Sequence, residues 1–352
     1  MKRAAFQRDA RRASLMSTYS AHRLGPSAGY ADDMLDRLSG LVVAAGLTVS
    51  ALVLVPPGPA AAVAAEPNPI ALIWNREHAP SPGPAQSIGG YSNGCVQGAV
   101  PLPASGRGFE DLHRSRNRFY GHPALVEFIR RLGESAKTQH LGLVVIGDLS
   151  QARGGPTPSG HRSHQTGLDV DIGYVAPPGA HARMRAAERE RVGPPAVVDL
   201  KTHVMSPLWT KRTVRLLAAA ASDPAVDRIF VNPAIRRTLC AGPARHEPWF
   251  ARLRPWWGHH DHFHVRLKCP DDSPLCKAQD PPPVEPDDGC GATLAWWFSP
   301  DAQNTEVKKK QTDEATPGPA LPDECAGLIA PATPPPASVS VPIPATTDPL
   351  TY

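Results

Sequence analysis

The chain has 352 residues, of which 41% are hydrophobic and 20% are charged, and its formal net charge is +4. This length fits one sizeable domain or two small ones, and the composition excludes a chain that is disordered throughout. Residues 1–64 hold seven Lys and Arg residues against four Asp residues, so the remainder is close to neutral. A nearly neutral body gives no electrostatic reason to expect nucleic acid as a partner.

The first 64 residues predict an export signal. Leu41 to Val55 is an uncharged apolar run, shorter than the roughly 20 residues that a transmembrane helix needs. Residues 62–64 (Ala-Val-Ala) fit the A-x-A pattern of signal-peptidase cleavage. The segment before the run is long for a signal peptide, which makes Met16 or Met34 alternative starts; an uncleaved membrane anchor is the alternative to cleavage. We expect a leader over residues 1–64, and an exported mature protein without stable membrane insertion.

The segment that follows the leader is expected to begin as a loop. Glu66 to Pro101 is rich in Gly, Ser and Pro, a composition typical of loops. Apolar residues at helical spacing then predict a helix over His122–Ala136. A second helix is predicted over Ser206–Asp223, with Ser206 as its cap and Pro207 at its first position.

Strands and shorter elements lie around these helices. Alternation or β-branched composition predicts strands over His140–Ser150, Gly167–Tyr174, Asp227–Pro233 and His262–Cys269. Ala234–Cys240 is predicted as a short helix or turn. Prolines cluster from Pro281, and they predict a disordered tail at the C-terminus. Between the first of these prolines and the tail, the segment Gly289–Phe298 has apolar residues that can dock on the body of the protein.

Two of the predicted strands carry polar residues on one face. Residues two apart in a strand share a face, so each strand has an apolar face, formed by Leu168, Val170 and Ile172 in the first and by Phe263, Val265 and Leu267 in the second. The opposite faces carry Asp169 and Asp171 in the first strand and His262, His264 and Arg266 in the second. If the strands are neighbours, His264 and Asp171 approach one point, and His164 on the preceding loop supplies a third ligand.

Two histidine nitrogens and one carboxylate oxygen suit Zn²⁺ with water in a fourth position. An open fourth position is typical of a catalytic site, because zinc activates the bound water. Each spacing taken alone is also typical of solvated polar residues. The two spacings together, on strands of consistent phase, favour a metal site.

The same residues carry a specific resemblance. "SGHRSHQTGLDVDI" (residues 159–172) and "PWWGHHDHFHVRLKCP" (residues 255–270) resemble the penicillin-insensitive murein endopeptidases. These are zinc peptidases of the group that includes lysostaphin-type enzymes and D-alanyl-D-alanine dipeptidases. "AQSIGGYSNGCVQGA" (residues 85–99) and "RIFVNPAIRRTLC" (residues 228–240) are similar to this family as well. The likeness covers about residues 68 to 327.

The resemblance implies an α+β fold in which a small antiparallel sheet carries the zinc site, surrounded by helices and long disulfide-tied loops. It implies a zinc metallopeptidase domain over residues 65–328, followed by the Pro-rich tail over residues 329–352. The implied activity is zinc-dependent hydrolysis of the cross-link between D-alanine and meso-diaminopimelate in peptidoglycan. A non-catalytic zinc-binding module that binds murein or regulates other hydrolases is the alternative, and a carboxypeptidase is a third option. A homodimer is left open.

Site residues carry over from the resemblance one by one. His164, Asp171 and His264 match the catalytic zinc ligands. His262 would lie beside the zinc-bound water as general base or oxyanion stabiliser, and His259 matches a further histidine near that site. Asp169 is expected either to support a ligand from behind or to face solvent. Arg162 brings a positive charge near the cleft without an assigned role.

An accessory second zinc is described for the family, with ligands matching His161, His203 and an aspartate three positions before the latter. Here that position is Leu200, and Asp199 is one residue away. The accessory site therefore requires a shifted loop, and solvated histidines are the alternative.

The dipeptidases of the group use a Glu three residues before the last histidine ligand as base, and this chain has Asp261 at that offset. Strand phase places Asp261 on the face of Phe263, away from the zinc. We therefore predict that Asp261 is not the base.

Six cysteines follow the leader, an even number that favours disulfides in an oxidising compartment. Spacing alone leaves fifteen pairings open, although Cys269 and Cys276 enclose a loop short enough to pair. The resemblance implies a nested pattern of Cys95–Cys325, Cys240–Cys290 and Cys269–Cys276.

Overall fold

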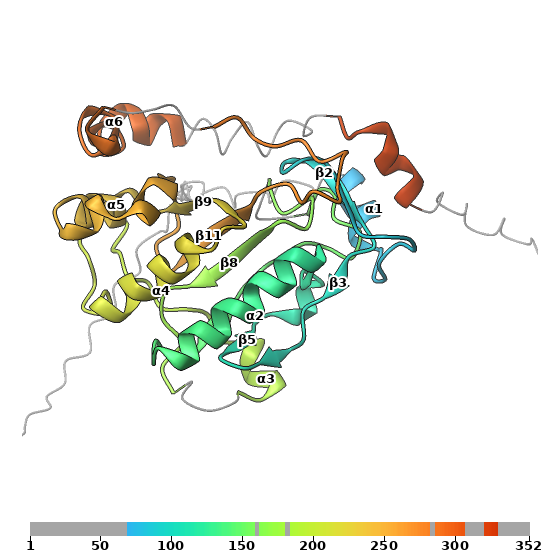
Figure 1. Ribbon diagram of the computed structural model, residues 1–352, viewed down its shortest axis with the longest axis horizontal. Coiled ribbons are helices and arrows are strands. Elements are labelled where there is room, and N and C mark those ends of the chain that lie inside the picture. Colours follow the sequence, from blue (N-terminus) through green and yellow to red (C-terminus); the bar gives the residue numbers. More distant parts are fainter. Residues whose placement is uncertain (1–68, 159–161, 180–183, 282–285, 307–319, 330–352) are drawn as a thin grey trace, which may run out of the picture. The chain divides into compact units, whose positions relative to one another are not determined.

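The computed structural model describes residues 69–158, 162–179, 184–281, 286–306 and 320–329 (Figure 1). The predicted leader lies outside the described residues, as does the predicted tail beyond residue 329. Among the described helices, none combines the length and the hydropathy that crossing a bilayer requires.

A mixed sheet organises the described part of the chain, with seven strands in the order β10-β9-β11-β8-β7-β5-β4. The strands are β4 (Ser105–Gly106), β5 (Phe109–Asp111), β7 (Val144–Ile146), β8 (Asp169–Gly173), β9 (Val226–Val231), β10 (Leu253–Pro255) and β11 (His262–Leu267). The central pairs, β9–β11, β11–β8 and β8–β7, are antiparallel. The expected combination of helices with a sheet is confirmed.

The expectation of a wholly antiparallel sheet is wrong outside this centre, because β10 pairs with β9 and β5 pairs with β7 in parallel. Each parallel pair is joined by a connection that contains a helix, α2 (Pro123–Thr138) between β5 and β7 and α5 (Pro233–Cys240) between β9 and β10. A helical crossover is the usual way to return a chain for parallel pairing.

Helices cover the sheet and supply much of the core. Figure 1 shows α2 and α4 (Lys211–Ser222) in front of the strands. The buried residues of α2 follow helical spacing and include Leu125, Phe128, Ile129, Leu132 and Ala136. His122 caps this helix, because its ring nitrogen Nδ1 accepts a hydrogen bond from the backbone N–H of Ala124. The predicted helix over His122–Ala136 is thus confirmed, with His122 just outside it.

The remaining elements are short. Short helices include α1 (Pro69–Asn75), α3 (Ala186–Arg189) and α6 (Ala292–Trp296). The 3₁₀ turns are η1 (Arg114–Arg116), η2 (Pro243–His246), η3 (Pro248–Arg252), η4 (Pro286–Gly289) and η5 (Asp323–Leu328). Two further antiparallel pairs join β1 (Gln86–Gly90) to β2 (Asn93–Gln97) and β3 (Val100–Pro101) to β6 (Tyr120–Gly121).

Three of the other predicted elements are confirmed, and a fourth is confirmed only in part. The strand over Asp227–Pro233, the helical alternative for Ala234–Cys240 and the strand over His262–Cys269 are confirmed as β9, α5 and β11. The strand predicted over His140–Ser150 is confirmed only as the three residues of β7. Gly142, with a φ of 94°, lies in the loop just before it.

Two further expectations are wrong. The predicted loop over Glu66–Pro101 contains α1 and the β1–β2 hairpin, because a contact with a distant loop supports this Gly-rich hairpin: the Ser87 N–H donates to Ser273 Oγ. The helix predicted from Ser206 begins at Lys211. Ser206 instead caps a preceding turn, and Thr210 with Thr213 forms the capping box of α4.

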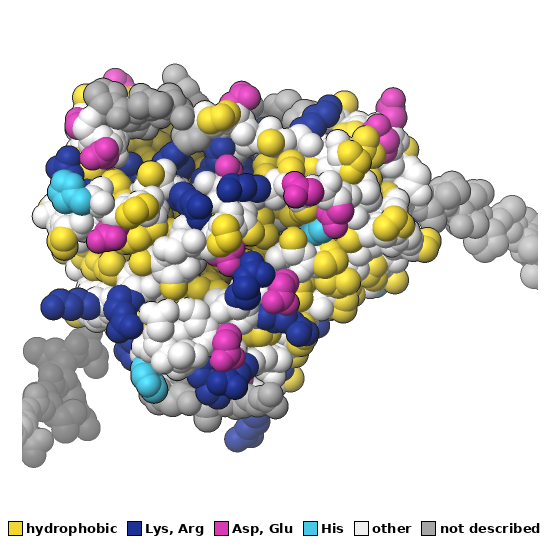
Figure 2. Space-filling model, viewed as in Figure 1, with side chains coloured by type: hydrophobic (Ala, Val, Ile, Leu, Met, Phe, Trp, Pro, Cys, Tyr) yellow, Lys and Arg dark blue, Asp and Glu magenta, His cyan; other side chains and the backbone are white. Residues whose placement is uncertain are grey.

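All six cysteines lie among the described residues and form the implied nested disulfides, Cys95–Cys325, Cys240–Cys290 and Cys269–Cys276. The outermost bond ties the β1–β2 hairpin to η5. The middle bond ties the end of α5 to the segment before α6, so the expected docking of Gly289–Phe298 is confirmed. Over the face seen in Figure 2, basic and acidic side chains are interspersed, in agreement with a nearly neutral body.

Candidate metal centre

The pairing of β8 with β11 places predicted ligands opposite one another. The strands are antiparallel, and His264 pairs with Asp171 while Arg266 pairs with Asp169. Side chains of directly opposite residues meet on one face of such a pair. The predicted neighbourhood of the two strands is therefore confirmed. A solvated polar face is wrong, because all five residues of β8 are buried and His164, from the preceding loop, lies against Asp171.

His164, Asp171 and His264 converge on this face. One potential ligand atom from each residue lies within 4.8 Å of the others. His164 Nε2 lies 3.4 Å and His264 Nδ1 lies 3.3 Å from the same oxygen, Asp171 Oδ1. All three side chains are buried. Within the described part of the chain, no other group of three His, Cys, Asp or Glu residues has this arrangement.

The loop position of His164 is fixed by its backbone. His164 has a φ of 67°, in the left-handed region that non-glycine residues rarely adopt. Its backbone N–H donates to Asp169 Oδ2 at 3.1 Å. The loop is thereby attached to the strand that carries Asp171, which keeps the His164 ring close to that carboxylate.

Asp169 supports the site from behind the ligands. It is fully buried, and its Oδ1 lies 2.9 Å from His264 Nε2 and 2.8 Å from Arg266 Nε. Burial alone would oppose ionisation, but the Arg266 guanidinium and the His264 ring hold the pKa of Asp169 well below its usual range. Because Asp169 occupies Nε2 of His264, Nδ1 is the nitrogen left toward Asp171. Asp169 thus contacts His264 as predicted, and the solvated alternative is wrong because Asp169 is buried.

The donor set fits a zinc ion. Two imidazole nitrogens and one carboxylate oxygen are common zinc ligands, and a carboxylate behind a ligating histidine is the usual support for such a site. Burial disfavours a charged imidazole, yet Asp169 and Asp171 raise the pKa of His264 to about 9. The two carboxylates therefore make this buried position favourable for a cation.

His262 lies beside the three converging residues. Its Nε2 is 3.8 Å from Asp171 Oδ1, and its Nδ1 is 2.6 Å from Asp261 Oδ1. Burial disfavours the charged ring, but Asp171 and Asp261 raise the pKa of His262. Strand phase did not predict the contact with Asp261, since adjacent side chains of a strand point to opposite faces. The signal that could have found it is that the two residues are consecutive at the start of the strand.

His259 joins the same cluster from the loop before β11. Its ring centroid lies 5.1 Å from that of His262 and 6.0 Å from that of His264. Burial and the neighbouring histidines lower the pKa of His259 to about 3, so the ring is neutral. Its Nδ1 lies 2.8 Å from the Trp257 carbonyl. A proton on Nδ1 would be donated to that oxygen, which leaves Nε2 as an acceptor.

The accessory site stays a prediction, because only one of its two histidines, His203, lies among the described residues. His161 lies outside the described residues. His203 is half-buried, and its ring packs edge-on against Phe298 at 5.3 Å. The Asp199 carboxylate accepts hydrogen bonds from the N–H groups of Lys201 and Thr202 within its own turn. Among the described residues, His203 belongs to no cluster of three potential ligands.

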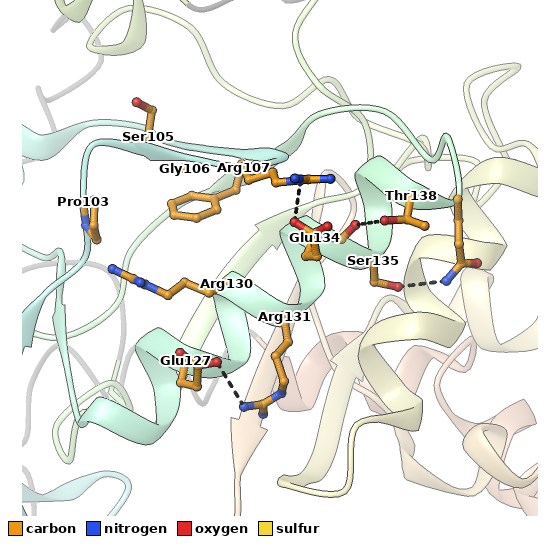
Figure 3. Close-up of a pocket in the computed structure, with 12 residues that line it drawn as sticks. Pro103, Ser105, Gly106, Arg107, Glu127, Arg130, Arg131, Glu134, Ser135 and Thr138 are labelled. Carbon is orange, nitrogen blue, oxygen red and sulfur yellow. Dashed lines mark hydrogen bonds and ion pairs between the residues drawn. The ribbon is translucent and has the colours of Figure 1, made fainter.

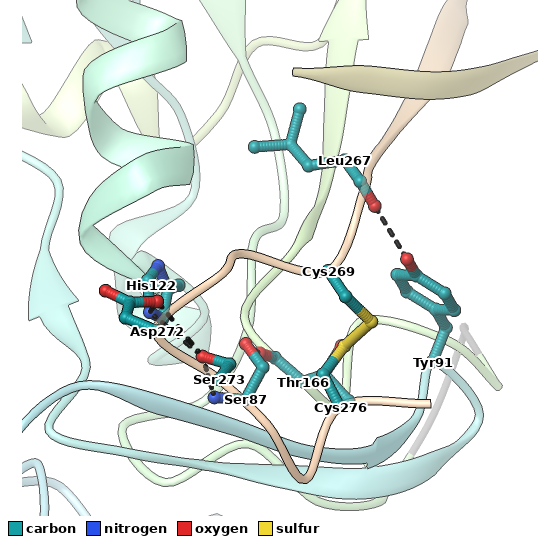
Figure 4. Close-up of a disulfide and its surroundings, with 9 residues drawn as sticks. All are labelled: Ser87, Tyr91, His122, Thr166, Leu267, Cys269, Asp272, Ser273 and Cys276. Carbon is teal, nitrogen blue, oxygen red and sulfur yellow. Dashed lines mark hydrogen bonds and ion pairs between the residues drawn. A yellow bond between two sulfur atoms is a disulfide. The ribbon is translucent and has the colours of Figure 1, made fainter. Parts of the chain in front are cut away.

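A second histidine–carboxylate cluster lies at the start of α2 (Figure 4). His122 Nε2 is 3.4 Å from both Ser273 Oγ and Asp272 Oδ1. Ser273 and Asp272 belong to the loop closed by Cys269–Cys276. Because Nδ1 of His122 accepts the Ala124 N–H, Nε2 carries the proton of the neutral ring and cannot take one from Ser273. The cluster therefore joins the disulfide loop to α2 and does not activate a serine.

A cavity of about 710 Å³ lies along the exposed face of α2 (Figure 3). Its wall includes charged residues that pair with one another, such as Arg107 with Glu134 at 2.6 Å. Arg131 pairs with Asp223 at 3.0 Å. None of the residues of the candidate metal centre lines this cavity. Its chemistry is that of a solvated helix face, so we assign it no role.

The fold and site thus define a class: a mixed helix-and-sheet domain, tied by disulfides, with a candidate centre of two histidines and one carboxylate. A family model described as penicillin-insensitive murein endopeptidase matches residues 87–330, and the chain belongs to this family.

Curated relatives agree with this assignment. A penicillin-insensitive murein endopeptidase of Yersinia enterocolitica is 40% identical over 273 residues, which cover 76% of this chain and 94% of the relative. Proteins of the same name from Shigella boydii and Escherichia coli are each 42% identical over 263 residues, which cover 74% of this chain and 91% of each relative.

Proposed function

We propose that this protein is a zinc-dependent murein endopeptidase that hydrolyses the D-alanyl–meso-diaminopimelyl cross-link of peptidoglycan. The observation that carries the proposal is the convergence of His164, Asp171 and His264, with His262 beside them, in a chain of this family. The names of the relatives supply murein as the substrate.

His164, Asp171 and His264 would hold the zinc ion, which supplies a Lewis acid and activates water when bound. Asp169 fixes the ring of His264 and so selects Nδ1 as its ligand atom. Asp261 accepts from His262 Nδ1, which orients Nε2 toward the centre. In this arrangement His262 moves the proton, as general base toward water and as donor toward the leaving amine. Asp261 acts through His262 and is not itself the base.

His259 contributes an acceptor at the same edge of the centre. Its neutral ring offers Nε2 to a water molecule or to an N–H group of the substrate. An accessory zinc held by His161 and His203 stays a prediction. No serine nucleophile takes part in this scheme, so β-lactams have no group to acylate, whereas chelators are expected to inhibit.

The cellular setting follows from the same proposal. Peptidoglycan as the partner places the protein in the periplasm, and three disulfides fit that oxidising compartment. The leader over residues 1–64 would direct export and be cleaved, leaving a protein with no stable membrane insertion and no nucleic-acid partner. A homodimer is compatible with this scheme, which does not require one.

A zinc-binding module without turnover is the second candidate. Such a module needs the three ligands but no oriented base. The 2.6 Å contact between His262 and Asp261 favours the enzyme, because it positions a proton acceptor that simple metal binding does not require.

Digestion of purified cross-linked muropeptide dimers tests the proposal, with products identified by mass. We expect release of monomers by the zinc-loaded protein, loss of release with a chelator, and recovery with added zinc. His262→Ala should retain zinc and lose turnover. Loss of a terminal D-alanine alone would indicate a carboxypeptidase, and no release with zinc bound would indicate the binding module; either result would contradict the proposal.

A further inference from the structure

Four tryptophans gather on the surface next to the candidate centre. They are Trp256 and Trp257, in the loop between β10 and β11, and Trp296 and Trp297, at the end of α6. We call this group the tryptophan wall. Its ring centroids are separated by 4.7 Å between Trp257 and Trp297, by 5.2 Å within each consecutive pair, and by 6.0 Å between Trp256 and Trp297.

The wall is not part of the hydrophobic core. Trp256 is 38% exposed and Trp296 is 39% exposed, whereas the core residue Trp74 is 1% exposed. A group of large apolar side chains exposed together on a protein surface often marks a site of interaction with a ligand or partner. Indole rings are suited to this role, because they offer a broad apolar face together with one N–H donor.

The wall is continuous with the candidate metal centre. The Phe230 ring lies 5.3 Å from the His264 ring and 5.9 Å from the Trp256 ring, so a single aromatic side chain separates the wall from a predicted ligand. The carbonyl of Trp257 is the group that His259 contacts at 2.8 Å. A substrate bound at the centre can therefore reach the wall past a single side chain.

The scaffold holds both halves of the wall in place. The backbone N–H of Trp256 donates to the Val231 carbonyl at 2.9 Å, and Asn232 Nδ2 donates to the Gly258 carbonyl at 2.6 Å. The other half follows Cys290, whose disulfide to Cys240 ties it to α5. Figure 1 shows α6 beside α5, in agreement with the contacts between the two helices. The indoles are thus presented on anchored segments, which lowers the entropy cost of binding.

We propose that the tryptophan wall binds the glycan strand of murein through stacking of indole faces on the sugar rings. The inference rests on the proposed function, because a peptide cross-link always lies between two sugar strands. A stem of about four residues spans at most ~14 Å when extended. The two ring-to-ring steps from His264 to Trp256 fall within that reach, so sugars attached to a stem bound at the centre can meet the wall.

The double variant Trp256→Ala/Trp296→Ala tests the wall, with Leu275→Ala as a matched control. Leu275 is a similarly exposed apolar residue, 42% exposed, on the Cys269–Cys276 loop. Two substrates are compared: cross-linked dimers that carry disaccharides on both stems, and the same dimers after the sugars are removed. The preference is the ratio of kcat/KM for the sugar-bearing dimer to kcat/KM for the sugar-free dimer. We expect this ratio to be about tenfold or more lower in the double variant than in the original protein, mainly because KM for the sugar-bearing dimer rises. The control should keep that preference.

Direct binding separates this inference from the proposed function. The zinc-loaded protein is titrated with peptide-free glycan strands, and circular dichroism shows that the variants are folded. Weaker binding by the double variant supports the wall even if no dimer is cleaved by either protein, in which case only the proposed function fails. The inference would be overturned if the double variant lost kcat/KM equally on the sugar-bearing and sugar-free dimers, or if it bound glycan strands as tightly as the original protein. A change in oligomeric state as the main effect of the double variant would also overturn it.

Discussion

The cluster on β8 and β11 and the cluster at the start of α2 both bury a histidine against a carboxylate, yet they differ in what their nitrogens do. In the first, Asp169 occupies one nitrogen of His264 and leaves the other directed toward Asp171. In the second, Nδ1 of His122 caps a helix while Nε2 faces the disulfide loop. Residue types alone therefore do not define a metal site. What defines it is whether ring nitrogens and carboxylate oxygens from several elements point to one position.

Replacement of one histidine in each cluster should give the largest contrast. We expect His264→Ala to abolish high-affinity zinc binding and with it turnover, because the centre would keep only two of its three ligands. His122→Ala should keep zinc and lose more stability than the about 1 kcal/mol of a helix cap alone, because the ring is also buried and contacts the disulfide loop. Zinc content after gel filtration, measured by mass spectrometry, and urea unfolding give the two readouts.

Equal zinc content in the two variants would contradict the distinction between the clusters. Circular dichroism of His264→Ala is the control, since loss of zinc by an unfolded protein would carry no information about the ligand. If His264→Ala is unfolded, His164→Ala removes a different predicted ligand, and it should give the same loss of zinc.

Replacement of one carboxylate in each cluster, Asp169 or Asp272, should give a similar contrast in zinc binding, but a smaller one than the two histidines give. Asp169→Asn leaves the buried Arg266 without its anionic partner, which is expected to cost about 3–5 kcal/mol of stability. It also removes the acceptor behind His264, which typically weakens metal binding by about 10–100-fold. Asp272 is 67% exposed, so Asp272→Asn should change stability by no more than about 0.5 kcal/mol.

Urea unfolding of the two carboxylate variants and zinc competition against a chromophoric chelator measure these effects. The zinc titration is made at a temperature where circular dichroism shows Asp169→Asn to be folded. If Asp169→Asn bound zinc as tightly as the original protein, the role of Asp169 behind His264 would be wrong.

The sequence predicted the convergence of His164, Asp171 and His264 better than it predicted what surrounds them. Alternation in two strands was enough to place Asp171 and His264 on the polar faces of their strands, because side-chain direction in a strand depends only on parity. That the two strands are neighbours, with these residues opposite one another, comes from the structure. Parity cannot report what covers a face, and so it did not show that β8 is buried throughout. The contact between Asp261 and His262 depends on rotamers at the start of a strand, which parity does not describe either.

Elements supported by distant contacts were also missed. The β1–β2 hairpin has the composition of a loop, and its support comes from the Cys95–Cys325 disulfide and from Ser273, far along the chain. The start of α4 was misplaced because Ser206 and Thr210 are both good caps, and the choice between them depends on where the chain turns. By contrast, α2 has its own apolar stripe and its own cap, and it was predicted almost to the residue.

The disulfide loop offers the mildest way to separate the two clusters. The double variant Cys269→Ala/Cys276→Ala removes the disulfide that closes the loop carrying Asp272 and Ser273, whose side chains contact His122. The two cysteines are separated by 7 positions in the sequence. Short closed loops give the smaller disulfide effects, so we expect a loss of about 2 kcal/mol in the free energy of unfolding. Zinc affinity should stay unchanged, because β11 is paired on both sides, with β8 and with β9, before the chain reaches Cys269. A parallel loss of zinc affinity would mean that the loop holds β11 in register, and the two clusters would then have to be treated as one structural unit.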